Sequence, residues 1–77
     1  MSASAEVISP KTIRVTVTDG DVTGVGVKRQ SDQAAISVTG CGTGQWCTGP
    51  NLSNGTYIVN VTYKILPSDT IPVDVTG

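Results

Sequence analysis

The side chains that could carry out chemistry in this chain are few. Its 77 residues include no histidine, which excludes histidine general bases, serine or cysteine triads and imidazole metal sites. The 6 acidic residues are scattered along the chain, and no two are spaced as a recognisable acid and base pair. We therefore expect a protein that is not an enzyme and that has no metal site and no cofactor.

The two cysteines are the most reactive groups present. Cys41 and Cys47 lie in the glycine-rich segment 40–50, and their spacing fits neither a redox C-x-x-C motif nor a four-ligand zinc site. The glycines let a short loop bend until the two Cβ atoms approach, and closing about seven residues stabilises a fold by roughly 2 kcal/mol. We predict a disulfide between them. The alternative is a pair of buried free thiols in a reducing compartment.

The same segment holds the chain's only tryptophan, Trp46, beside Gln45. An indole that stacks on a sugar ring, next to an amide that binds hydroxyls, is typical of a carbohydrate-binding site. The competing interpretation is that Trp46 covers one end of a core that contains no phenylalanine. We favour the core role, and we expect Tyr57 and Tyr63 to be core residues with their hydroxyls at the rim. A carbohydrate-binding module using Trp46 and Gln45 is the alternative function.

Composition limits the partners. The formal net charge of -1 and the isoelectric point near 4.9 exclude the basic surface that nucleic acids and anionic membranes require. No apolar run is long enough to enter a membrane as a helix. The length predicts a single domain spanning residues 1–77. Residues 1–6 lack the basic and apolar regions of a secretory signal, so a secreted protein would be present here in its mature or excised form.

The elements that must position these residues are β-strands. Valine, isoleucine and threonine alternate with period two, and no helical period is visible. Asp19-Gly20-Asp21 has the composition of a hairpin turn, Gly40 to Pro50 has too many glycines for a regular strand, and Pro72 predicts an edge strand. Strands are predicted at residues 7–8, 12–18, 22–28, 34–38, 56–65 and 70–75.

The inward faces follow from the alternation. We expect these apolar side chains to point into one core: Ile13, Val15, Val17, Val25, Val27, Ala34, Ile36, Val38, Tyr57, Val59, Val61, Tyr63, Ile65, Ile71, Val73 and Val75. About six to seven short strands with turns between them are typical of an antiparallel β-sandwich. A five-stranded barrel is the alternative fold.

Three segments together resemble a known family. Residues 12–21 form a valine and threonine strand with an acidic turn, residues 22–25 carry a valine pair, and residues 52–62 read LSNGTYIVNVT. This pattern, with Trp46 near the usual tryptophan, resembles bacterial immunoglobulin-like repeat domains of surface adhesins and phage virion proteins. The resemblance implies an immunoglobulin-like β-sandwich that acts as a spacer or attachment unit outside the cell, with neighbouring protein modules or subunits as its partners.

All three asparagines lie in N-x-S/T sequons, at Asn51, Asn54 and Asn60. Asn60 has the parity of an outward side chain in its predicted strand, so a glycan there is sterically permitted. In a eukaryotic or archaeal source these sequons indicate a surface location.

Overall fold

A computed structural model describes residues 3–18 and 21–76 of the chain. The described residues form β-strands and connecting turns, with no helix, and therefore no helix that could cross a membrane. The strands are β1 (Ala3–Ile8), β2 (Thr12–Val17), β3 (Val22–Arg29), β4 (Ala35–Ile36), β5 (Val38–Gly42), β6 (Gln45–Thr48), β7 (Gly55–Tyr63) and β8 (Asp69–Val75).

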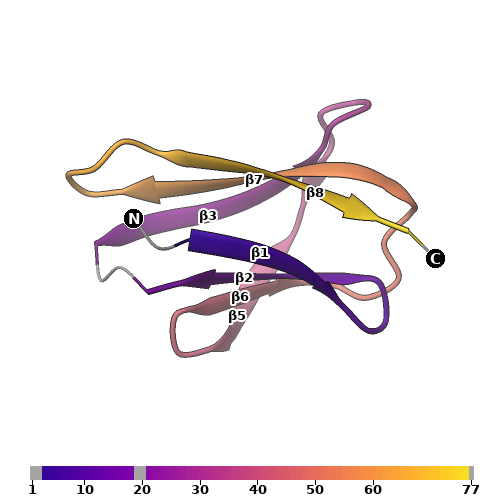
Figure 1. The fold of residues 1–77 in the computed structure, drawn as a ribbon, viewed down its shortest axis with the longest axis horizontal. Helices are drawn as coiled ribbons and strands as arrows, with labels where there is room; N and C mark the ends of the chain where they lie inside the picture. The colour runs from indigo at the N-terminus through magenta and orange to yellow at the C-terminus, as the bar shows by residue number, and fades with distance from the viewer. Residues whose placement is uncertain (1–2, 19–20, 77) are drawn as a thin grey trace.

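The strands form two antiparallel sheets of four strands each, which pack face to face (Figure 1). We name the sheet with the order β1-β2-β6-β5 sheet 1 and the sheet with the order β4-β3-β7-β8 sheet 2. The prediction of an all-β, two-layered antiparallel fold is confirmed, and the described residues form eight strands in place of the expected six or seven. The additional strands come from the segment after Ala34.

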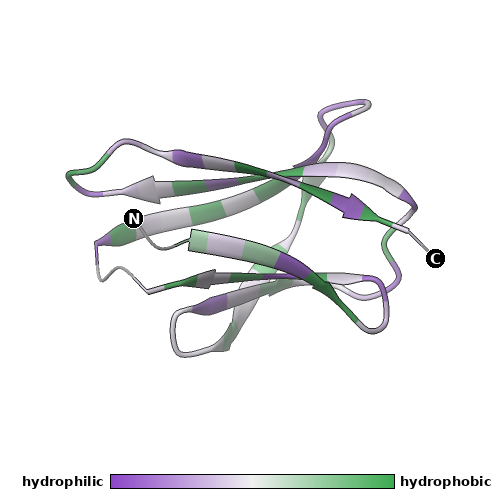
Figure 2. Cartoon of the chain, in the orientation of Figure 1, coloured by the Kyte–Doolittle hydropathy of each residue, from purple (hydrophilic) through white to green (hydrophobic). Residues whose placement is uncertain are grey.

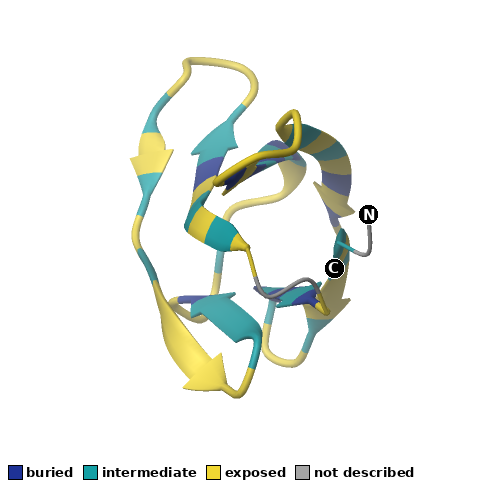
Figure 3. Ribbon diagram, turned by 90° about the vertical axis from the view of Figure 1, so that its left-hand side faces the viewer, coloured by how far each residue is buried: buried dark blue, intermediate teal, exposed yellow. Residues whose placement is uncertain are grey.

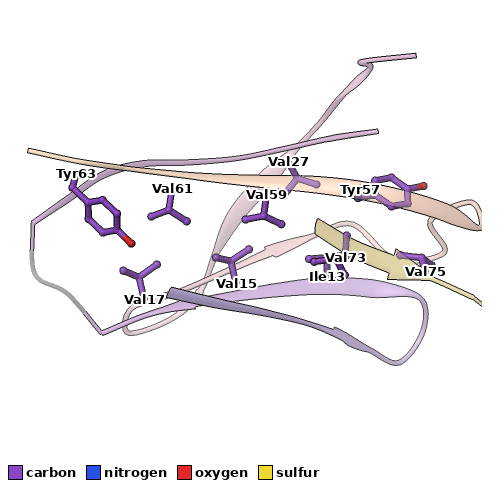
Figure 4. Packing of buried hydrophobic residues seen from close by; sticks show 10 residues of the cluster. All are labelled: Ile13, Val15, Val17, Val27, Tyr57, Val59, Val61, Tyr63, Val73 and Val75. Atoms are coloured by element: carbon purple, nitrogen blue, oxygen red, sulfur yellow. The ribbon is translucent and has the colours of Figure 1, made fainter. Parts of the chain in front are cut away.

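Hydrophobic and hydrophilic residues alternate along the strands (Figure 2), and the core lies between the two sheets. From sheet 1 the buried hydrophobic side chains are Ile13, Val15 and Val17, and from sheet 2 they are Val27, Tyr57, Val59, Val61, Tyr63, Val73 and Val75. Figure 4 shows the two rows facing each other. Burying such side chains stabilises a fold by about 1.5 to 3 kcal/mol each, so this double row is the main source of stability.

The predicted inward stripe of β7 is confirmed except at its end. Tyr57, Val59, Val61 and Tyr63 are buried, but Ile65 is 81% exposed. The strand ends at Tyr63, and residues 64–68 form an irregular loop before β8. Parity predicts a face only while the backbone stays extended, so the prediction for Ile65 is wrong.

The sequence predicts an irregular loop for the glycine-rich segment, and this prediction is wrong, because the segment forms a hairpin. β5 and β6 pair from Val38–Thr48 to Gly42–Gln45 around a turn at Thr43 and Gly44. Gly44 has φ +67°, and a Cβ there would stand 2.7 Å from the carbonyl oxygen of Val17. The amide of Val17 donates a 2.8 Å hydrogen bond to the carbonyl of Gly44. Glycine is therefore what allows the hairpin to close against β2.

The hairpin predicted at Asp19-Gly20-Asp21 is also wrong. β2 belongs to sheet 1 and β3 to sheet 2, so this segment connects the two layers and does not join neighbouring strands. Asp19 and Gly20 lie outside the described residues. The carbonyl of Asp21 accepts a 2.8 Å hydrogen bond from the amide of Lys64, which ties the start of β3 to the loop after β7.

The chain also changes sheets between β4 and β5. Ile36 pairs with Val27 of sheet 2, and two residues later Val38 pairs with Thr48 of sheet 1, so Ser37 is the crossing point. This crossing segment runs largely exposed along one side of the molecule (Figure 3). On the other side of sheet 2, β8 is the edge strand, as Pro72 predicts.

Candidate functional site

Trp46 lies on strand β6 and faces the core. It pairs with Val15 of β2 on one side and with Gly40 of β5 on the other. Directly opposed residues of antiparallel strands share a face, and Val15 is fully buried, so Trp46 lies on the inner face of sheet 1. The indole is half-buried and packs against the core cluster. This is the position of a core lid at the margin of the sandwich.

Gln45 leaves the opposite face of the same strand. Successive strand residues alternate in direction, so the Gln45 side chain lies on the outer face, where it pairs with Thr16 and Gly42. Its Oε1 stands 2.6 Å from where a Cβ of Gly42 would be, so the amide lies over that glycine. The structure does not bring Trp46 and Gln45 onto one surface.

The predicted disulfide is present. Cys41 and Cys47 are bonded with their Cα atoms 5.7 Å apart, and the structure holds no free cysteine. Cys41 is the extra residue of a β-bulge between Gly40 and Gly42, and Cys47 pairs with Thr39 and Arg14. The bond therefore joins the edge strand β5 to its single neighbour β6, which keeps the edge from separating.

The region that sequence reasoning missed is the side of the sandwich between β3 and β5. β4 is only two residues long and pairs with Val27 and Lys28 of the eight-residue β3. In the described residues no strand pairs with Val22–Gly26 on that side. Nearby, these apolar side chains are only partly buried against the core: Val25, Ile36, Val38 and Trp46. The sequence carries no direct signal of this unpaired edge, because the alternation at residues 34–38 continues across the change of sheet.

The outer face of sheet 2 is polar. Thr70 donates a 3.1 Å hydrogen bond to the Oδ1 of Asn60, and Thr56 donates one of 2.7 Å to Asp74. The outward parity predicted for Asn60 agrees with this position. Asn51 and Asn54 are exposed in the segment before β7.

Charged groups do not form a reactive cluster in the part of the chain that the structure describes. The Nε of Arg14 donates a 3.0 Å hydrogen bond to Glu6 across β1 and β2, and Arg29 lies 3.4 Å from Asp32. The described residues contain neither a group of three potential metal ligands nor a pocket.

Comparison with protein-family models, with curated proteins and with solved structures gives no significant match for this chain.

Proposed function

We propose that the two sheets form an immunoglobulin-like sandwich. In that fold one sheet has the strand order A-B-E-D and the other contains C, F and G. In this chain β1, β2, β6 and β5 of sheet 1 correspond in order to A, B, E and D. In sheet 2, β3, β7 and β8 correspond to C, F and G, and β4 is an added strand beside C. This correspondence of strand order supports the proposal.

Tyr57 gives independent support. Immunoglobulin-like domains often carry a tyrosine near the start of strand F whose hydroxyl bonds to the backbone a few residues upstream. Tyr57 is near the start of β7, is 1% exposed, and donates a 2.7 Å hydrogen bond to the carbonyl of Ser53. The cysteine bond differs from the one in antibody domains, because it joins β5 to β6 within one sheet.

We propose that the module works as a structural spacer or attachment unit without enzymatic activity. The observation that carries this proposal is the placement of the chain ends. β8 ends near one end of the long axis, which measures 35 Å, and β1 starts in the opposite half of the molecule (Figure 1). Copies or other modules can therefore be joined end to end without folding back.

The terminal strands suit such a role. β1 is held to β2 by six register pairs, and β8 is held to β7 by seven. A force along the long axis pulls β1 and β8 along their own strand directions, perpendicular to the interstrand hydrogen bonds. All hydrogen bonds between a terminal strand and its neighbour are therefore loaded together. The disulfide and the absence of a membrane-spanning helix among the described residues are compatible with an extracellular place, on a cell surface or a virion.

Single-molecule force measurements on a tandem repeat of this chain test the proposal. Loading through the two termini shears β1 and β8, and we expect unfolding at a several-fold higher force than in a control loaded through residue 54 and the C-terminus. The control peels β8 from β7, because Gly55 and Val75 are directly opposed and the ladder opens one pair at a time. Equally low forces in both geometries would remove the mechanical role.

A further inference from the structure

We infer that the edge of β3 beside Val25 is a docking site for an extended strand of a partner polypeptide. The inference deepens the proposed attachment role, on which its biological use rests, by naming the surface and the partner's chemistry. Its physical basis is the short pairing of β3 with β4, which stops at Ser37 because the chain crosses to sheet 1 there.

The backbone of Val25 points toward the open side. The amide of Arg29 donates a 2.9 Å hydrogen bond to the carbonyl of Ala34, and the amide of Gln30 donates one of 3.0 Å to Thr56 of β7. Because peptide groups alternate in direction along a strand, Val27 and Val25 point the same way as Arg29. The N–H and C=O of Val25 thus point away from β7.

The missing neighbour can be located by register. Val27 faces Ile36 and Lys28 faces Ala35, so a continued β4 would place residue 38 opposite Val25. Val38 instead pairs with Thr48 of sheet 1. In the described residues the change of sheet therefore leaves the pairing groups of Val25 without a strand partner on this side. An added strand that continues the β4 ladder would pair with them, which is a common mode of peptide recognition.

The inner face beside this edge accepts one more side chain. A residue opposite Val25 on an added strand shares its inward direction. It would approach Gly40 and Trp46, which are paired on the inner face of sheet 1. No atom lies within 4 Å of the position where a Cβ of Gly40 would stand. The partner strand is therefore expected to carry an apolar residue at this position.

The edge also lacks the usual protection against strand pairing. Natural edges are commonly blocked by proline or by charged side chains. β8 has Pro72, Asp69 and Asp74, whereas Val22–Gly26 of β3 has neither proline nor a charged residue. This contrast between the two sides of sheet 2 favours the β3 side as the docking edge.

The test uses Trp46 fluorescence and a synthetic peptide with the sequence of residues 12–18, TIRVTVT, in which apolar residues alternate. We expect a saturable change in Trp46 emission and at least a ten-fold slowing of amide hydrogen exchange at Val25. The same peptide with alternate backbone amides N-methylated cannot complete the ladder, and we expect its affinity to fall at least ten-fold.

Two matched variants locate the site on the protein. Gly40→Val fills the open position on the inner face and is expected to weaken peptide binding at least ten-fold. Gly26→Val is the control, because its Cβ also meets no atom within 4 Å but points to the outer face. Its peptide affinity should match that of the wild type. Urea unfolding of both variants verifies that they are folded.

Four results would overturn the inference. The first is equal binding of the N-methylated peptide, and the second is unchanged binding by Gly40→Val. The third is an emission change that grows with protein concentration without peptide, which would assign the edge to a second copy of this chain. Absence of any saturable response at millimolar peptide would also overturn it and would leave the force measurement of the spacer role unaffected.

Discussion

The hydroxyl of Tyr57 donates a 2.7 Å hydrogen bond to the carbonyl oxygen of Ser53, which fixes the segment before β7 against the most deeply buried aromatic side chain of the core. Tyr57→Phe keeps the ring and removes this bond. We expect a loss of about 1 kcal/mol in the free energy of unfolding, measured by urea titration. Ser53→Ala is the control, because the acceptor belongs to the backbone. A loss in Ser53→Ala equal to that in Tyr57→Phe would contradict this account.

The side chain of Thr48 takes the place of a backbone carbonyl as the hydrogen-bond acceptor for a buried amide of β2. Its Oγ1 accepts a 3.1 Å hydrogen bond from the amide of Ile13, and both residues are buried. Thr48→Val preserves the shape but leaves this amide unsatisfied, so we expect a loss of about 1 to 3 kcal/mol in urea unfolding. Thr39→Val, at an exposed position of β5, should change stability by less than about 0.5 kcal/mol. Wild-type stability of Thr48→Val would mean that the amide finds another partner.

Gly44 is constrained twice, by its φ of +67° and by the carbonyl of Val17. Gly44→Ala should therefore lower the free energy of unfolding by at least about 1 to 2 kcal/mol, the cost of the left-handed conformation alone. Gly49→Ala provides the comparison, because an added Cβ there meets no atom within 4 Å. Thermal unfolding of the two variants measures the difference, and equal midpoints would refute the constraint.

The bond between Cys41 and Cys47 closes a short loop, so its contribution is modest. The urea midpoint of the wild type should fall on reduction by an amount equivalent to about 2 kcal/mol. The double variant Cys41→Ser with Cys47→Ser should match the reduced protein and should not respond to the reductant. A reduced wild type as stable as the oxidised one would show that the bond adds nothing to folding.

The sequence predicted the strands whose alternation is uninterrupted. β2 and β7 carry the core residues at the expected parity, because one face of each strand must be buried. Ile65 departs from this pattern because the strand ends two residues earlier, and no hydrophobic period can show where an extended backbone stops. Gly40 to Gly42 were misjudged because glycine lowers strand propensity, yet pairing with β6 and the disulfide outweigh that preference.

The alternation pattern could not predict which strands are neighbours in a sheet. Alternation identifies which face of a strand is buried but not which strand lies beside it, so the flanks of Asp19-Gly20-Asp21 were paired with each other. The candidate pair Trp46 and Gln45 failed to share a surface for a simpler reason. Neighbours in a strand point in opposite directions, and the strand itself had not been predicted.

The passage of the chain through Ser37 has a consequence for how the molecule comes apart. One short covalent tether links a strand of the first layer to a strand of the second. Separation of β4 from sheet 2 or of β5 from sheet 1 therefore displaces the other strand as well. Because the two layers also share one core, neither can keep its apolar face buried alone, so heat or denaturant should melt both in a single concerted step.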